Sequence, residues 1–122
     1  MPPSASVLLA AAVVALGAAA AHAQDVFKGS DVFQDHCSRC HVLSGIGQGP
    51  NLIGVVGRKA ASLPDYPYSA ALRASGLTWT AASLDAFVQG PGKLVPGTAM
   101  RAIVPDPTDR QNLIAYLATL HR

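Results

Sequence analysis

The pentapeptide Cys37-Ser38-Arg39-Cys40-His41 constrains this chain more than any other stretch. The pattern C-x-x-C-H is the attachment signature for c-type haem. Two thiols at this spacing lie close together on one turn of chain, so both can add to the vinyl groups along one edge of a haem. His41 follows directly and can offer its imidazole to the iron. A C-x-x-C pair alone would also fit zinc, a redox dithiol or a disulfide, but zinc needs further ligands, and the adjoining histidine favours haem.

Residues 1–23 have the features of a secretory signal peptide. The stretch from Val7 to Ala21 is apolar, uncharged and short for a membrane span, and Ala21-His22-Ala23 is an A-x-A type cleavage site. We expect cleavage after Ala23, which leaves one domain of residues 24–122 in the periplasm. The first six residues contain no lysine or arginine. An uncleaved leader that anchors the protein in the membrane is therefore the alternative.

The mature sequence predicts an all-α domain with three main helices and short helices between them. Asp25 is a candidate cap for a first helix that ends at His36, and Asp106-Pro107-Thr108-Asp109 is a favourable start for the last helix. Between them, we expect a short helix over residues 70–75 and a third helix from Thr80 or Ser83 to residues 89–92. Proline and glycine predict an extended loop over residues 93–105.

Met100 lies in that loop and is the only methionine outside the leader. A thioether opposite a histidine raises the potential of haem iron, and His/Met ligation suits electron transfer because no open position remains. His36 is the competing candidate ligand, although its place next to Cys37 puts it on the attachment side of the haem. A vacant sixth position would instead suit chemistry on peroxide or a small gas.

Charge argues against a nucleic-acid partner. All nine lysines and arginines and all seven acidic residues, each an aspartate, lie in residues 24–122, so the formal net charge is +2. No basic run is present. Two haem propionates would bring the net charge close to zero.

Beyond single motifs, the mature chain resembles the class I c-type cytochromes, the group of mitochondrial-type cytochrome c and bacterial cytochrome c2. The resemblance runs from Gly29 to Leu120 and depends on the order and spacing of several pieces. These are Gly29 with Phe33, residues 37–41, Gly49-Pro50-Asn51-Leu52, Gly57-Arg58-Lys59, Tyr66 with Tyr68-Ser69, Trp79, Pro96-Gly97-Thr98-Ala99-Met100, and Leu113-Ile114-Ala115-Tyr116-Leu117.

The resemblance implies the cytochrome c fold around one haem c, covalently attached through Cys37 and Cys40. It implies His41 and Met100 as the iron ligands, Pro50 as the carbonyl that holds His41, and Thr98 as a support for the Met100 loop. Gly29 and Phe33 should meet the last helix. The residues expected around the haem propionates are Arg58, Tyr66, Tyr68 and Trp79. Taken without the resemblance, Trp79 and the tyrosines fit plain core packing equally well.

The implied function is that of a soluble monohaem electron carrier, not an enzyme. Its iron would cycle between Fe(II) and Fe(III), with a donor such as a quinol–cytochrome c reductase or a dehydrogenase and an oxidase or reductase as acceptor. We expect a monomer with no nucleic-acid partner and no stable membrane insertion once the leader is removed. The alternatives are a cytochrome subunit in a stable complex with a periplasmic dehydrogenase, and a haem enzyme with a labile sixth ligand.

The sequence departs from the family pattern in four places. The loop between His41 and Pro50 is shorter than in mitochondrial members, Ala99 replaces a lysine, Phe87 replaces a tyrosine, and Ala102 replaces an aromatic residue. These changes argue against a ring of lysines that docks to an acidic partner. A weak basic rim could still be formed by four residues, Arg39, Arg73, Lys93 and Arg101. We therefore expect electron transfer to depend only weakly on salt.

Overall fold

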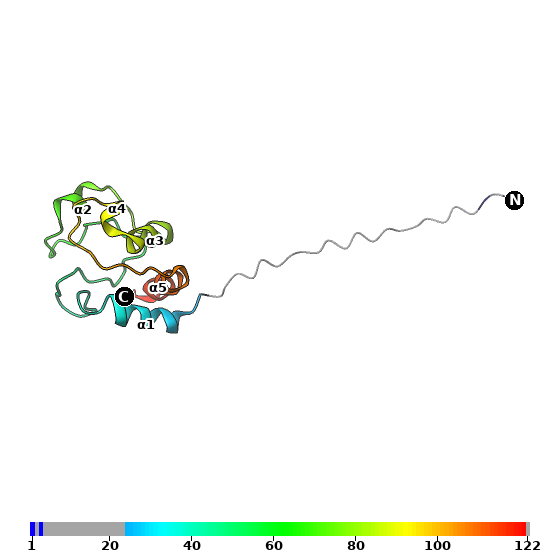
Figure 1. Cartoon of the computed structure of the whole chain (residues 1–122), viewed down its shortest axis with the longest axis horizontal. Helices are drawn as coiled ribbons and strands as arrows, with labels where there is room; N and C mark the ends of the chain where they lie inside the picture. Colours follow the sequence, from blue (N-terminus) through cyan, green and yellow to red (C-terminus); the bar gives the residue numbers. More distant parts are fainter. Residues whose placement is uncertain (2, 4–23, 122) are drawn as a thin grey trace.

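The computed structural model describes residues 1, 3 and 24–121, so nearly all of the expected leader lies outside the described residues. Within residues 24–121 the chain forms helices and no strands, and Lys59 and Thr78 make an isolated β-bridge. The main helices are α1 (Val26–His36), α3 (Ala81–Gln89) and α5 (Pro107–Thr119), and the short ones are α2 (Ala70–Ala74) and α4 (Pro91–Leu94) (Figure 1). The all-α prediction is confirmed.

The helix ends follow the capping residues seen in the sequence. The side chain of Asp25 accepts from the Lys28 N–H at the start of α1, and Asp106 accepts from the Asp109 N–H at the start of α5. Ser83 reaches back to Thr80 in a capping box that starts α3. No helix among the described residues is both long and apolar enough to cross a membrane.

The predicted loop over residues 93–105 is wrong at its start. Pro91 opens the four-residue helix α4, and the Val95 N–H closes it on the Pro91 carbonyl at 2.8 Å. A proline is tolerated at the first helical position because its missing N–H would have no partner there. Gly90 both ends α3 and begins α4, so the two helices share one residue as a joint.

Helices α1 and α5 pack directly on each other and hold the two ends of the domain together. They lie side by side in Figure 1, with α2, α3 and α4 on the other side of the molecule. A Cβ atom at Gly29 would overlap the backbone oxygen of Asn112, so the two helices touch through their main chains at this point. Phe33 and Tyr116 pack with ring centroids 5.5 Å apart, and the expected meeting of Gly29 and Phe33 with the last helix is confirmed.

Candidate functional site

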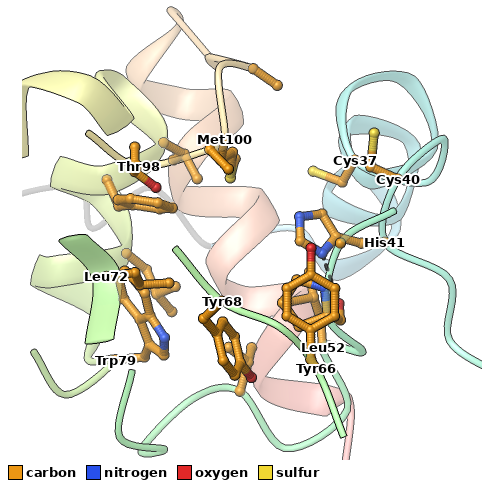
Figure 2. A pocket seen from close by; sticks show the side chains of 18 of the residues that line it. Cys37, Cys40, His41, Leu52, Tyr66, Tyr68, Leu72, Trp79, Thr98 and Met100 are labelled. Carbon is orange, nitrogen blue, oxygen red and sulfur yellow. Dashed lines mark hydrogen bonds between the residues drawn. The ribbon is translucent and has the colours of Figure 1, made fainter. Parts of the chain in front are cut away.

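One cavity brings together all ten residues predicted to bind or surround the haem. It has a volume of about 430 Å³ and a mainly apolar lining, within the range that is usual for small-molecule and cofactor sites. Figure 2 shows Cys37, Cys40 and His41 on one wall, with Met100 and Thr98 on the opposite wall. Its lining includes Cys37, Cys40, His41, Pro50, Arg58, Tyr66, Tyr68, Trp79, Thr98 and Met100.

The attachment motif is a tight turn at the end of α1. The N–H groups of Cys37 and Ser38 both donate to the Phe33 carbonyl, and the His41 N–H donates to the Cys37 carbonyl at 2.9 Å. Cys37 is buried and Cys40 is partly buried, and no disulfide joins them. Burial raises the pKa of the Cys37 thiol to about 11. Because a neutral thiol is a poor nucleophile, burial makes the Cys37 thiol less reactive than an exposed one.

The His41 ring is held in place by a hydrogen bond to the backbone of Pro50. Its Nδ1 lies 2.8 Å from the Pro50 carbonyl oxygen (Figure 2), and a hydrogen bond there makes Nδ1 the donor and leaves Nε2 with a lone pair. Burial lowers the pKa of His41, and the hydrogen bond to Pro50 opposes that shift. Neutral imidazole is the form that binds metals, so both the burial and the tautomer suit ligation.

Gly49 is a site residue whose contact the sequence analysis missed. A Cβ atom at this position would lie 2.7 Å from Cε1 and 2.8 Å from Nδ1 of the His41 ring. The backbone of Gly49 therefore lies against the imidazole, just before the residue whose carbonyl holds it. The glycine next to Pro50 was the available signal, but a Gly-Pro pair also marks an ordinary turn.

The Met100 wall comes from the segment between α4 and α5. Met100 is partly buried and packs against the core cluster, while its neighbours Ala99 and Arg101 are exposed at the cavity rim. The Thr98 N–H donates to the Val95 carbonyl at 3.0 Å and fixes the chain just before this stretch. His36, the competing ligand, is exposed at the last residue of α1, next to Cys37.

The polar residues of the cavity differ in how many of their donors the chain already uses. Arg58 donates to the carbonyls of Asn51 and Ile53 at 3.0 and 3.1 Å. Burial lowers the pKa of Arg58, and the electrostatic interaction with Tyr68 opposes that shift. Tyr66 donates its hydroxyl proton to the Gln48 carbonyl.

Two further donors keep their protons available. The Tyr68 oxygen accepts from the Leu63 N–H at 3.3 Å, and within residues 24–121 neither the Tyr68 hydroxyl proton nor the Trp79 indole N–H meets an acceptor. Trp79 also packs on Phe87, with ring centroids 4.9 Å apart. Trp79 therefore packs in the core and still has an unused hydrogen-bond donor.

The arrangement fits a haem held on one edge. Two thiols and an imidazole nitrogen share one wall, a thioether lies on the other, and apolar side chains such as Leu52, Leu72 and Phe87 line the space between them. The donors of Tyr68 and Trp79 suit the acidic edge of such a group.

Comparison with known proteins agrees with this geometry. The Cytochrome c family model matches residues 26–121. The chain is 40% identical to cytochrome c2 of Rhodomicrobium vannielii, over 94% of each protein. It is 42% identical to cytochrome c of Tetrahymena pyriformis, over 79% of this chain and 89% of the relative. The solved structure of cytochrome cH from Methylobacterium extorquens matches with a TM-score of 0.74 at 42% identity, over 78% of this chain and 98% of that one.

The matched residues contain both cysteines of the attachment motif and every other residue of the cavity named above. The chain belongs to the cytochrome c family, and it is a monohaem electron carrier whose haem c is attached through Cys37 and Cys40.

Proposed function

We propose that His41, through Nε2, and Met100, through its sulfur, would hold the haem iron from opposite sides of the cavity. When bound, the haem supplies the Fe(III)/Fe(II) couple, and the chain supplies the ligands and the apolar surroundings. The observation that carries the proposal is the opposition of the two residues across one cavity, with the His41 ring fixed by the Pro50 carbonyl. Two filled positions keep peroxide and small gases off the iron, so the protein acts as a carrier and not as an enzyme.

The polar residues of the cavity have separate tasks in this proposal. Tyr68 and Trp79 donate to the haem propionates, because each has a proton without an acceptor in the described chain. Arg58 and Tyr66 support the surrounding loops and add positive charge and a dipole near the same edge. Thr98 holds the chain that leads to Met100.

We also propose that residues 1–23 are removed and that the mature domain of residues 24–122 works in the periplasm. Its donor would be a quinol–cytochrome c reductase or a dehydrogenase, and its acceptor an oxidase or a reductase. The naming of a bacterial relative as cytochrome c2 and of a solved neighbour as cytochrome cH supports an exported carrier of this kind. It would meet these partners as a monomer.

The visible spectrum of the haem-loaded protein tests the axial pair. The ferric wild type should show the weak long-wavelength charge-transfer band of sulfur bound to iron, and Met100→Ala should lose it. His36→Ala is the matched control, because it removes the competing ligand and should keep the band. A wild-type spectrum without the band, unchanged in Met100→Ala, would show that Met100 is not a ligand.

A further inference from the structure

Arg110 is the buried charged residue of the described chain, and the sequence analysis gave it no role. Only 6% of its surface is exposed, although it is a charged residue on α5. Burying a guanidinium is costly unless its donors are paired. Its partners therefore indicate what the residue holds in place.

Those partners connect three parts of the molecule. The Arg110 Nε donates to the Asp85 carboxylate of α3 at 2.8 Å. Its NH1 group donates to the carbonyls of Val104 and Pro105, at 3.0 and 2.8 Å. These two residues follow Met100 by four and five positions and lead into α5.

The segment between the anchors has little else to hold it. We call residues 99–103 the methionine strap. In the part of the chain that the structure describes, no hydrogen bond reaches these residues, and four of them, Ala99, Arg101, Ala102 and Ile103, are exposed. The strap is fixed before its start by the Thr98 N–H on the Val95 carbonyl, and after its end by Arg110 and by the Val104 N–H on the Val88 carbonyl at 2.8 Å.

We propose that Arg110 is a positioning residue for Met100: it fixes the far end of the methionine strap and so keeps the sulfur on its side of the cavity. The inference rests on Met100 being the sixth ligand, as proposed above. Without the guanidinium, two carbonyls at the end of the strap lose their donor, and the strap is restrained on that side mainly by the Val104 N–H. States in which Met100 has left the cavity then become more populated.

An added ligand measures that population. Imidazole binds the ferric iron only where Met100 has left it, so its apparent affinity rises in proportion to the open fraction. We expect Arg110→Gln to bind imidazole about tenfold more tightly than the wild type, which corresponds to about 1.4 kcal/mol. Arg110→Lys should fall between the two, because an ammonium is a point charge that cannot reproduce the fork of a guanidinium.

Asn112→Ala is the matched control. Asn112 is equally buried on the same helix, and its side chain accepts from the Asp25 N–H at 2.9 Å, at the start of α1 and not on the methionine strap. This variant should lower the melting temperature without changing the imidazole affinity by more than about twofold, since a factor of two is a small free-energy change. Equal affinities in wild type and both Arg110 variants would overturn the proposal, as would a parallel change in Asn112→Ala.

Failure of this inference can be separated from failure of the axial-ligand proposal. If the wild type lacks the sulfur-to-iron band, the ligand assignment fails and the role of Arg110 fails with it. If the band is present and the Arg110 variants bind imidazole as the wild type does, only the positioning role is wrong. Should Arg110→Gln not fold, Arg110→Lys and Asn112→Ala still decide the question.

Discussion

At the scale of single residues, the His41 side of the cavity depends on a carbonyl and on the absence of a side chain. Pro50 orients the ring through Nδ1, and Gly49 lets the backbone approach the same ring. The two residues are adjacent, so the loop that presents the carbonyl must also come into contact with the imidazole. A change at Gly49 therefore disturbs the hydrogen bond at Pro50 as well.

Gly49→Ala should weaken this arrangement. The added Cβ would lie 2.7 Å from the ring, and either the imidazole or the Pro50 turn must move. Overpacking of this kind costs about 1–3 kcal/mol. We expect a lower melting temperature for the haem-loaded variant, with altered ligand-field bands in its visible spectrum.

Gly92→Ala is the control for Gly49→Ala. No atom lies within 4 Å of the Cβ position at Gly92, and alanine improves helix propensity by up to about 1 kcal/mol in the short helix α4. It should not lower the melting temperature, and it should leave the spectrum unchanged. If Gly49→Ala behaves in the same way, the contact with His41 is unimportant.

The residues of the cavity could largely be named from the sequence, but their geometry could not. Cys37, Cys40 and His41 follow from a local motif, since their spacing alone brings the thiols and the imidazole together. Gly49 and Arg110 were missed because their importance comes from contacts with residues elsewhere in the chain. A glycine in a loop or an arginine in a helix can have many roles, and only the contacts in the folded structure show which role applies.

At the scale of helices, the contact between α1 and α5 closes the domain. Gly29 allows the two backbones to touch, Phe33 packs on Tyr116, and the Asn112 side chain accepts from the Asp25 N–H at the start of α1. Helix α1 leads directly into the attachment motif, and α5 carries Arg110. The same helix pair therefore supports both walls of the cavity.

Gly29→Ala tests that support. Its Cβ would overlap the Asn112 carbonyl oxygen and lie 2.9 Å from the Tyr116 Cβ, so α1 and α5 must separate. The cost of overpacking, about 1–3 kcal/mol, exceeds the gain of up to about 1 kcal/mol from replacing a helical glycine. We expect a clear loss of stability on chemical denaturation.

Asp31→Ala provides the comparison on the same helix. Asp31 is exposed on α1, and its replacement should change the free energy of unfolding by less than about 0.5 kcal/mol. If Gly29→Ala is as stable as Asp31→Ala, the close backbone contact does not constrain the helix pair.

Helix boundaries were predictable where a capping residue marks them, and less so where a turn is very short. Asp25, Thr80 and Asp106 act at the positions that their side chains indicated. Helix α4 is four residues long and contains proline and glycine, so no periodic pattern of apolar residues predicts it. Its stability comes from its junction with α3 and from the buried Val95 that follows it.

At the scale of the whole molecule, the surface around the cavity mouth carries little charge. Ala99 and Ala102 line the rim and are exposed, and nearby Ile103 is 48% exposed. The nearby cations are Arg101, which lies on the rim itself, and Lys93, and both are exposed. With a formal net charge of +2 before the haem propionates are counted, neither the rim nor the whole molecule produces a strong field.

Electron self-exchange tests this surface with no partner other than the protein itself. Two copies must bring their rims together, so a strongly charged rim would slow the reaction at low salt and recover as salt screens the repulsion. We expect the rate constant, measured from NMR line widths of mixed ferric and ferrous protein, to change by less than about threefold as ionic strength rises from roughly 0.01 to 0.15 M, although the Debye length falls from about 30 to about 8 Å.

The double variant Ala99→Lys, Ala102→Lys supplies the contrast. It adds two cations at exposed rim positions without removing a buried group, so its self-exchange should be slow at low salt and rise steeply with ionic strength. Because only the rim charge differs between the two proteins, the dependence of the double variant's rate on ionic strength shows the effect of a strongly basic rim. A wild-type rate that rises as steeply as that of the double variant would mean that Arg39, Lys93 and Arg101 already form an effective basic ring, and partner docking would then be governed by charge and not by the apolar rim.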